Sequence, residues 1–220
     1  MSQITINPHY PPVDKRKINE VMEISSRGFL SRTASNVLLD AAGINRSTQI
    51  IANTEEQAHM AAISVGWPIA MKAVMDGDKQ AVGAIAINVA DIGTLKVEFT
   101  RIKKVANVTQ VSIEPMLSGS ELFIKASRQY EGLHTIRCGV VATKKVIAEE
   151  STPITPELAN KMVSGFDNSI NKVIFAEVIR RVSALLSVAP YIISIEISPL
   201  ISNKRTVTAL NARISIDSRD

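Results

Sequence analysis

Cysteine and histidine are scarce in this sequence, which has one cysteine, Cys138, and three histidines among its 220 residues. A single cysteine excludes an intrachain disulfide framework. These residues also do not supply a typical structural zinc site, which draws mainly on cysteine thiolates. Apolar runs of about 18 residues are absent, so no membrane-spanning helix is expected. The polar N-terminus lacks the apolar segment of a signal peptide, and we therefore expect a cytoplasmic location.

Aromatic residues and strong charge are also scarce. Phe, Trp and Tyr make up 4% of the chain, against 45% for all hydrophobic residues, so the core should be mainly aliphatic. The formal net charge is +4 and no long run of like charges occurs, so nucleic acid is not an expected partner. The composition is that of a globular chain, long enough for one large domain or two lobes.

Local signals predict a mixture of helices and strands. Helices are expected to begin at or directly after Lys17, Ser31, Thr54, Asp91, Pro156 and Ser169, from capping residues followed by apolar residues at helical spacing. Strands are expected within residues 48–53, 68–74, 83–89, 108–117, 120–130, 133–142, 191–202 and 206–216. Consecutive strands and several hairpins favour an α+β fold over a doubly wound parallel sheet. Three prolines in the first 16 residues indicate a linker there.

Six stretches, taken in order, resemble one known family. They read LLDAAGI, TEEQAHMAAISVGWPIAMK, GAIAINV, IEPMLSGSELFIKAS, SALLSVAPYIISIEISPLI and VTALNARISI. Together they resemble the ATP-grasp domain of NDP-forming acyl-CoA synthetases, which include the ADP-forming acetate–CoA ligases and the succinyl-CoA synthetase β subunit. The similarity runs from about Phe29 to Ile216. It implies an ATP-grasp fold of two α/β lobes, residues 29–107 and 108–220, after a linker and short helix over 1–28.

The resemblance also implies a function. In this family ATP phosphorylates a histidine, and the phosphoryl group passes to an acyl phosphate made at a CoA-binding subunit. The chain would then be the nucleotide-binding domain or subunit of an ADP-forming acetate– or acyl-CoA ligase. It would bind ATP and Mg²⁺ and work in a hetero-oligomer, or a longer chain, with a CoA-binding domain or subunit. Phosphoryl transfer depends mostly on positioning and charge neutralisation, so the loss of any such group would be serious.

Four residues match the family's nucleotide-binding positions. Lys72 matches the strand lysine that contacts phosphate, although spacing alone favours a solvated strand lysine, and only the resemblance reverses that preference. Glu114 and Met116 lie in the stretch that matches the adenine-facing hinge, where backbone groups can read the base. Glu121 matches a glutamate on the following strand, and an outward-facing strand residue is the alternative.

Asp78 stands where the family has its histidine, the expected phosphoryl acceptor. Aspartate is phosphorylated in some enzymes. The sequence Asp76-Gly77-Asp78 is also good turn chemistry, which favours loss of the acceptor. No catalytic residue is therefore assigned.

Two further parts of the family's site are altered. Only Gly139 remains of a glycine-rich segment whose amides would approach phosphate. The magnesium site would fall on Glu196, Ser198 and Asn211, of which only the first is a carboxylate. Because Mg²⁺ prefers hard oxygen ligands with at least one carboxylate, this site should be weakened. An alternative interpretation follows: a catalytically degenerate ATP-grasp module with a structural or regulatory role in a complex.

Overall fold

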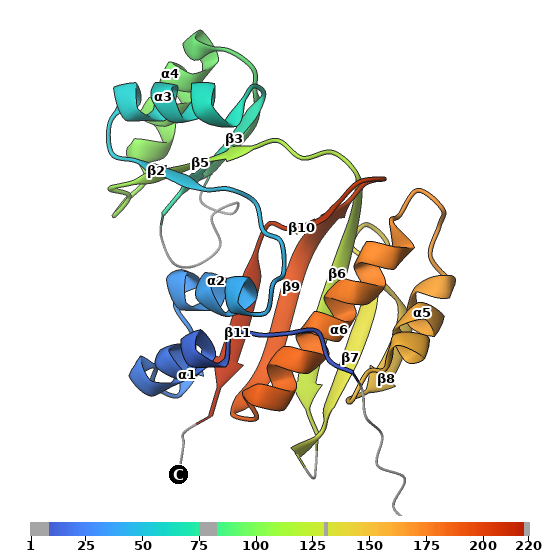
Figure 1. Ribbon diagram of the computed structural model, residues 1–220. Helices are drawn as coiled ribbons and strands as arrows, with labels where there is room; N and C mark the ends of the chain where they lie inside the picture. The colour runs from blue at the N-terminus through green and yellow to red at the C-terminus, as the bar shows by residue number, and fades with distance from the viewer. Residues whose placement is uncertain (1–8, 75–82, 130–131, 218–220) are drawn as a thin grey trace, which may run out of the picture. The chain divides into compact units, whose positions relative to one another are not determined.

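The computed structural model describes residues 9–74, 83–129 and 132–217 (Figure 1). The chain divides into two compact units. The larger unit combines the chain up to Arg46 with the chain from Ser118 onward, and the smaller unit is Ser47–Leu117. The fold is α+β, as expected from the sequence.

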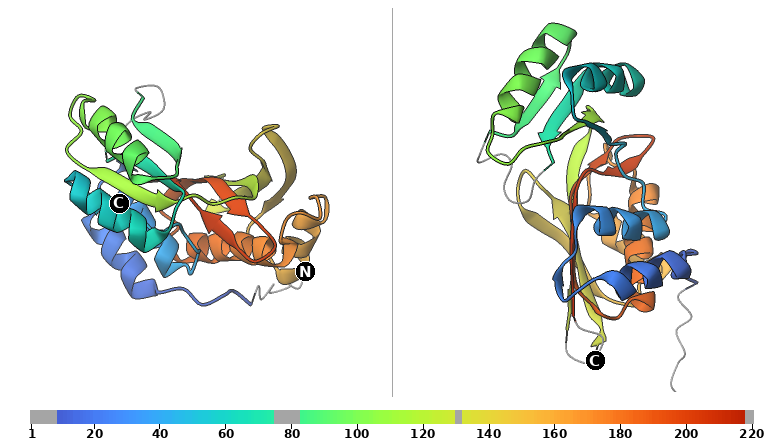
Figure 2. Two further views of the ribbon diagram at one scale, coloured as in Figure 1. Left: turned by 90° about the horizontal axis from the view of Figure 1, so that it is seen from above. Right: turned by 90° about the vertical axis from the view of Figure 1, so that its left-hand side faces the viewer.

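The larger unit is a seven-stranded antiparallel sheet with helices packed on one face. Its strands are β1 (Gly28–Phe29), β6 (Ser120–Arg128), β7 (His134–Val140), β8 (Lys145–Ser151), β9 (Ile192–Ser202), β10 (Val207–Ala209) and β11 (Ala212–Ile216). Its helices are α1 (Lys15–Ile24), α2 (Arg32–Ala41), α5 (Pro156–Ser164) and α6 (Lys172–Val188). The strand order is β1-β11-β9-β6-β7-β8, with β10 also paired to β9. Figure 2 shows α1, α2 and α6 on the same side of this sheet.

Strand alternation decides which residues of this sheet reach the core. In β9, Ile195 and Ile197 are buried against the helices, while Glu196 between them is half-buried on the other face. Burial of such aliphatic side chains is the main stabilising contribution to a core of this kind. The second face of the sheet is left for polar and charged side chains, and we call it the open face.

The smaller unit is a four-stranded antiparallel sheet with two helices. Its strands are β2 (Ile50–Ala52), β3 (Ile69–Ala73), β4 (Ile85–Val89) and β5 (Val111–Pro115), in the order β2-β5-β3-β4. Its helices are α3 (Glu55–Val65) and α4 (Ile92–Lys103). The separate core of this unit is almost entirely aliphatic, with Phe99 as its one fully buried aromatic among the described residues.

Three expected helix caps, Ser31, Thr54 and Asp91, and the expected helix start at Pro156 are confirmed. The side chains of Ser31, Thr54, Asp91 and Thr155 each accept a hydrogen bond from the backbone N–H three residues later. The expected start of the long helix at Ser169 is wrong. Asn171 is the cap of α6, because its side chain accepts from the N–H of Ile174, whereas the N–H of Ser169 donates into a turn at Asp167.

The two units divide the chain differently from the expected lobes, 29–107 and 108–220. Helix α2 belongs to the larger unit, because Leu38 and Leu39 are buried in its core. Helix α1, placed by sequence in a separate N-terminal segment over 1–28, also buries Ile18 and Met22 there. Helix α1 packs against α2, and α2 packs against β11 more than a hundred residues further along the chain, so no local signal in the sequence assigns these helices to this unit.

Strand β8 was not expected from the sequence. Residues Lys145–Ser151 pair with β7, with an irregularity between Cys138 and Gly139. This edge strand has an exposed, charged sequence that lacks the apolar alternation of a half-buried strand, so only the pairing identifies it. Within the described ranges, no helix has the length and apolar character required to cross a membrane.

Candidate functional site

Lys72 and Glu114 form an ion pair inside the smaller unit. Lys72 lies on β3 and Glu114 on the neighbouring strand β5, and Lys72 Nζ donates to Glu114 Oε2 at 2.6 Å. The lysine side chain is 18% exposed and the glutamate side chain is 1% exposed. Residues on either side of Lys72 along β3 are buried, so its stem packs while its ammonium group still reaches solvent. A lysine held in this way can direct its ammonium group to an anionic ligand.

Glu114 is held by more than the lysine. Its Oε1 atom accepts from Ser112 Oγ at 3.0 Å and from Gln49 Nε2 at 3.2 Å. A buried carboxylate without such donors would be costly, so this network explains why Glu114 is tolerated in an aliphatic unit. We call Gln49, Lys72, Ser112 and Glu114 the Lys72 cluster. The sequence interpretation placed Glu114 at an adenine contact and did not foresee that its side chain is the lysine's counterion.

The amide of Met116 is already hydrogen-bonded. It donates to the carbonyl oxygen of Pro68 at 3.1 Å, and Pro115 before it has no amide proton to donate. An adenine ring that used the Met116 amide would therefore have to displace Pro68. Asp78, which replaces the family's histidine, lies outside the described residues together with its turn.

The larger unit carries a row of five charged residues across its open face. Neighbouring strands place Arg213 opposite Glu196, Glu196 opposite Lys125, Lys125 opposite Arg137, and Arg137 opposite Glu149. We call these five residues the charged row. It runs through β11, β9, β6, β7 and β8, and its three cations and two carboxylates give it a formal net charge of +1.

The charged row is held by side-chain contacts. Lys125 Nζ lies 2.8 Å from Glu196 Oε1 and 5.8 Å from the centre of the Phe123 ring. Arg137 makes a bidentate pair with Glu149, at 2.8 and 3.0 Å. Hydrogen bonding within this pair lowers the pKa of Glu149 and raises the pKa of Arg137. At the other end, the guanidinium of Arg213 stacks over Phe29, 4.5 Å from the ring centre.

The expected magnesium ligands do not fit a magnesium site. Glu196 and Ser198 share the open face, and the carbonyl of Asn211 accepts from the Ser198 amide, so the three residues are neighbours. However, Glu196 is the only carboxylate of the set and is bound by Lys125. Arg213 lies opposite it on the next strand. Mg²⁺ requires hard anionic oxygens, and nearby cations oppose it. Within the described residues, no group of three His, Cys, Asp or Glu side chains could hold a metal.

Glu121 and Gly139 do not join the expected ligands. Glu121 is exposed on β6 opposite Ile201, and it lies four residues before Lys125. Gly139 lies within strand β7, where a Cβ atom would overlap the carbonyl oxygen of Lys145 and come within 2.6 Å of the Phe123 ring. Its hydrogen is therefore required for packing, and it does not lie in a phosphate-binding loop.

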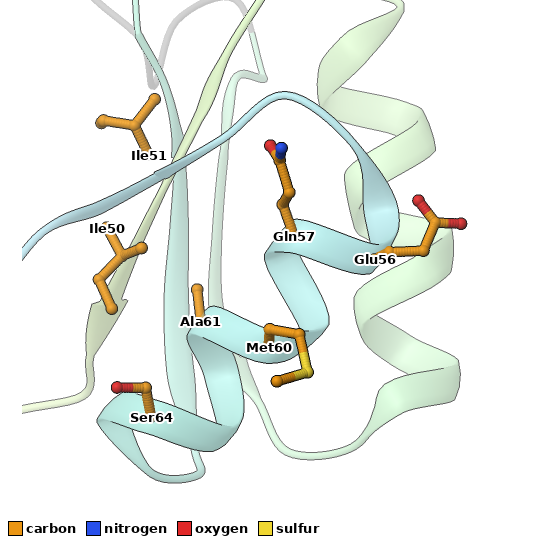
Figure 3. A pocket seen from close by; sticks show the side chains of 7 residues that line it. All are labelled: Ile50, Ile51, Glu56, Gln57, Met60, Ala61 and Ser64. Carbon is orange, nitrogen blue, oxygen red and sulfur yellow. The ribbon is translucent and has the colours of Figure 1, made fainter.

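A shallow pocket lies elsewhere in the smaller unit. Its volume is about 470 Å³, and α3 and β2 line it with Ile50, Ile51, Glu56, Gln57, Met60, Ala61 and Ser64 (Figure 3). None of the residues expected to bind nucleotide or metal is among these. Sequence reasoning did not single out Gln49 and Ser112, which contact Glu114, or Lys125 and Arg137 of the charged row. The alternation of side chains along β6 and β7 could have placed Lys125 and Arg137 on the open face. It could not have shown that the two residues lie opposite each other.

The chain thus consists of two α+β units, each with an antiparallel sheet, and the smaller one holds a partly exposed strand lysine. The chain belongs to the ATP-grasp domain family, which it matches over residues 22–216. This match bears out the fold that the sequence resemblance implied. No curated protein matches the chain.

Solved structures share this fold at low sequence identity. One is a dinucleotide-forming acetyl-coenzyme A synthetase 1 of Ca. Korarchaeum cryptofilum in complex with coenzyme A and Ca-AMPCP, with a TM-score of 0.77 and 16% identity over 93% of this chain and 100% of that one. A Pyrococcus horikoshii protein has a TM-score of 0.76 and 21% identity over 94% and 99%. ATP citrate lyase of Methanothrix soehngenii, in complex with citrate and coenzyme A, has a TM-score of 0.60 and 16% identity over 88% and 52%.

Proposed function

We propose that the chain is the ATP-binding domain or subunit of an ADP-forming acyl-CoA ligase and acts with a CoA-binding domain or subunit. The observation that carries the proposal is the Lys72 cluster. It holds an ammonium group at the surface of β3, with a packed stem and a buried counterion, in a chain of the ATP-grasp family. The ammonium has three donors and the contact with Glu114 uses one, so it can also bind a phosphate.

Two features support the acyl-CoA part of the proposal. The chain matches the ATP-grasp family along most of its length. Two of its structural neighbours, the acetyl-coenzyme A synthetase and ATP citrate lyase, are complexes with coenzyme A. We propose that ATP binding is the part of the reaction that this chain carries, and that CoA and the acyl group, acetate among the candidates, bind to the partner in a hetero-oligomer. A cytoplasmic location, which the single cysteine fits, completes the proposal.

Mg²⁺ bound by Glu196, Ser198 and Asn211 is not part of the proposal, because Lys125 and Arg213 flank the only carboxylate of that set. The residues proposed to contact ATP are Lys72, the backbone of Glu114, and Met116 through its carbonyl group, because its amide donates to Pro68.

Calorimetric titration of the full chain with ATP tests this function. We expect micromolar binding that Lys72→Ala weakens at least tenfold, equivalent to about 1.4 kcal/mol. Lys104→Ala is the matched control, because Lys104 is an exposed lysine of the same unit. Equal weakening by both variants, or no heat at millimolar ATP, would refute ATP binding. Titration with CoA should give no heat, and binding of CoA to this chain alone would contradict its assignment to a partner.

A further inference from the structure

The charged row on the open face of the larger unit has no role in the function proposed above. Its composition distinguishes it from a cation site, because three of its five side chains are cations. The expected metal ligand Glu196 lies between two of these, Arg213 and Lys125. The arrangement therefore attracts anions and opposes a divalent cation.

Lys125 and Arg137 lie directly opposite each other on β6 and β7. Like charges at directly opposed positions of an antiparallel pair destabilise the sheet. Each of these cations has a carboxylate on its far side, Glu196 for Lys125 and Glu149 for Arg137. A bound anion between the two cations would offset the remaining repulsion.

The existing ion pairs leave the two cations able to bind a ligand. The side chains of Lys125, Glu196, Arg137 and Glu149 are 52%, 43%, 46% and 47% exposed. Exposed ion pairs of this kind are weak because solvent screens them, so a phosphate can compete for either cation. Lys125 also has ammonium donors that Glu196 does not use, and Arg137 has guanidinium donors beyond the two directed at Glu149.

We propose that Lys125 and Arg137 bind the phosphates of a polyphosphate ligand directly, without a divalent cation held by Glu196, Ser198 and Asn211. In this arrangement Lys125 supplies the positive charge near Glu196 that a metal would otherwise supply. The ligand class is a nucleoside polyphosphate, an assignment that rests on the ATP binding proposed above. The metal-free character rests on the charged row alone.

The first arm of the test measures metal binding without nucleotide. The full chain is titrated with Mn²⁺ as a substitute for Mg²⁺, and free Mn²⁺ is followed by its paramagnetic resonance signal. We expect no saturable binding at concentrations up to about 1 mM, well above the range of tight protein sites. A Mn²⁺ site that disappears in Glu196→Gln would overturn the proposal.

The second arm measures phosphate binding without metal. The full chain is titrated calorimetrically with inorganic tripolyphosphate in EDTA, and circular dichroism verifies that each variant is folded. We expect binding that Lys125→Met weakens at least tenfold. Lys204→Met is the control, because Lys204 is an exposed lysine in the turn between β9 and β10 of the same unit. Absence of binding in EDTA, or equal affinity in wild type and Lys125→Met, would refute the role of Lys125.

These outcomes separate the two proposals. If ATP binds only when Mg²⁺ is present, the proposed ATP binding is supported and the proposal of metal-free phosphate binding by Lys125 and Arg137 is wrong. If tripolyphosphate binds in EDTA through Lys125 but ATP does not bind under any condition, the nucleotide function is wrong and the anion site stands.

Discussion

Lys72 Nζ lies 2.6 Å from Glu114 Oε2, across the pair of strands β3 and β5. The carboxylate is almost completely buried and its other oxygen accepts from Ser112 and Gln49. The lysine is therefore positioned before any ligand arrives. A phosphate that bound here would meet an ammonium group whose stem and counterion already restrict its motion, which lowers the entropy cost of binding.

Replacing Lys72 by methionine should destabilise the smaller unit. The substitution keeps the packed stem but leaves Glu114 buried without its cation. Removal of one partner from a fully buried pair costs about 3–5 kcal/mol, and the partial exposure of Lys72 reduces our expectation to about 2 kcal/mol. Urea unfolding followed by circular dichroism measures the loss.

The double variant Lys72→Met with Glu114→Gln is the control for this prediction. It removes the buried charge along with its partner, so it should recover at least half of the lost stability. If the double variant were as unstable as the sum of the single variants, the two side chains would not be coupled, and the ion pair would not be the cause.

Replacing Gly139 by alanine should disrupt the pairing of β7 and β8. The new methyl group would overlap the Lys145 carbonyl and press on Phe123, both within packed structure. We expect a loss of about 3 kcal/mol, at the upper end for overpacked sites. Thermal unfolding measures it. Gly165→Ala is the matched control, because its methyl group would meet only the Ile147 side chain, at 3.2 Å. Equal effects would contradict the packing role of Gly139.

The buried thiol of Cys138 should make stability fall at alkaline pH. Burial raises its pKa from 9.0 to about 12. Between these values the unfolded chain loses the thiol proton and the folded chain keeps it, so unfolding is favoured as pH rises above 9. The contribution at pH 10 is about 1.4 kcal/mol. We expect Cys138→Ala to be less stable than wild type at both pH 8 and pH 10. Its unfolding free energy should, however, fall less between these two pH values, because the variant lacks the thiol that titrates.

Buried His134 should make stability fall at mildly acidic pH. Burial is the main cause that lowers its pKa below 6.5, and the nearby charge of Arg128 also lowers it. Nε2 lies 2.7 Å from the carbonyl oxygen of Ile192, so this nitrogen carries the hydrogen and donates a hydrogen bond to that oxygen. Below pH 6.5 the unfolded chain binds a proton that the folded chain does not, so stability falls.

His134→Gln tests this contribution, because glutamine can still donate a hydrogen bond but does not titrate. We expect its unfolding free energy to fall less than that of wild type between pH 7 and pH 5, measured by urea unfolding at each pH. Parallel pH profiles for the two proteins would show that His134 contributes nothing to the acid sensitivity.

The sequence by itself determined the family and much of the local structure, although not strand β8 or the start of α6. Capping residues such as Thr54 and Asp91 fixed helix starts, because their side chains act on amides only a few residues away. Alternation placed Glu196 and Ser198 on one face of a strand, because neighbouring side chains point to opposite faces. The order of motifs indicated the ATP-grasp fold, which the family match supports.

The tertiary structure decided what each polar residue contacts. Lys72 and Glu114 are 42 residues apart in sequence, and the register of β3 and β5 brings them together. Lys125, Glu196 and Arg213 form part of the charged row only because β6, β9 and β11 are neighbours in one sheet. A residue's own sequence neighbourhood does not specify its cross-strand partners, since strand order and register depend on the packing of the whole core. The sequence therefore singled out Glu196 among the expected magnesium ligands, and the fold put Lys125 and Arg213 beside it.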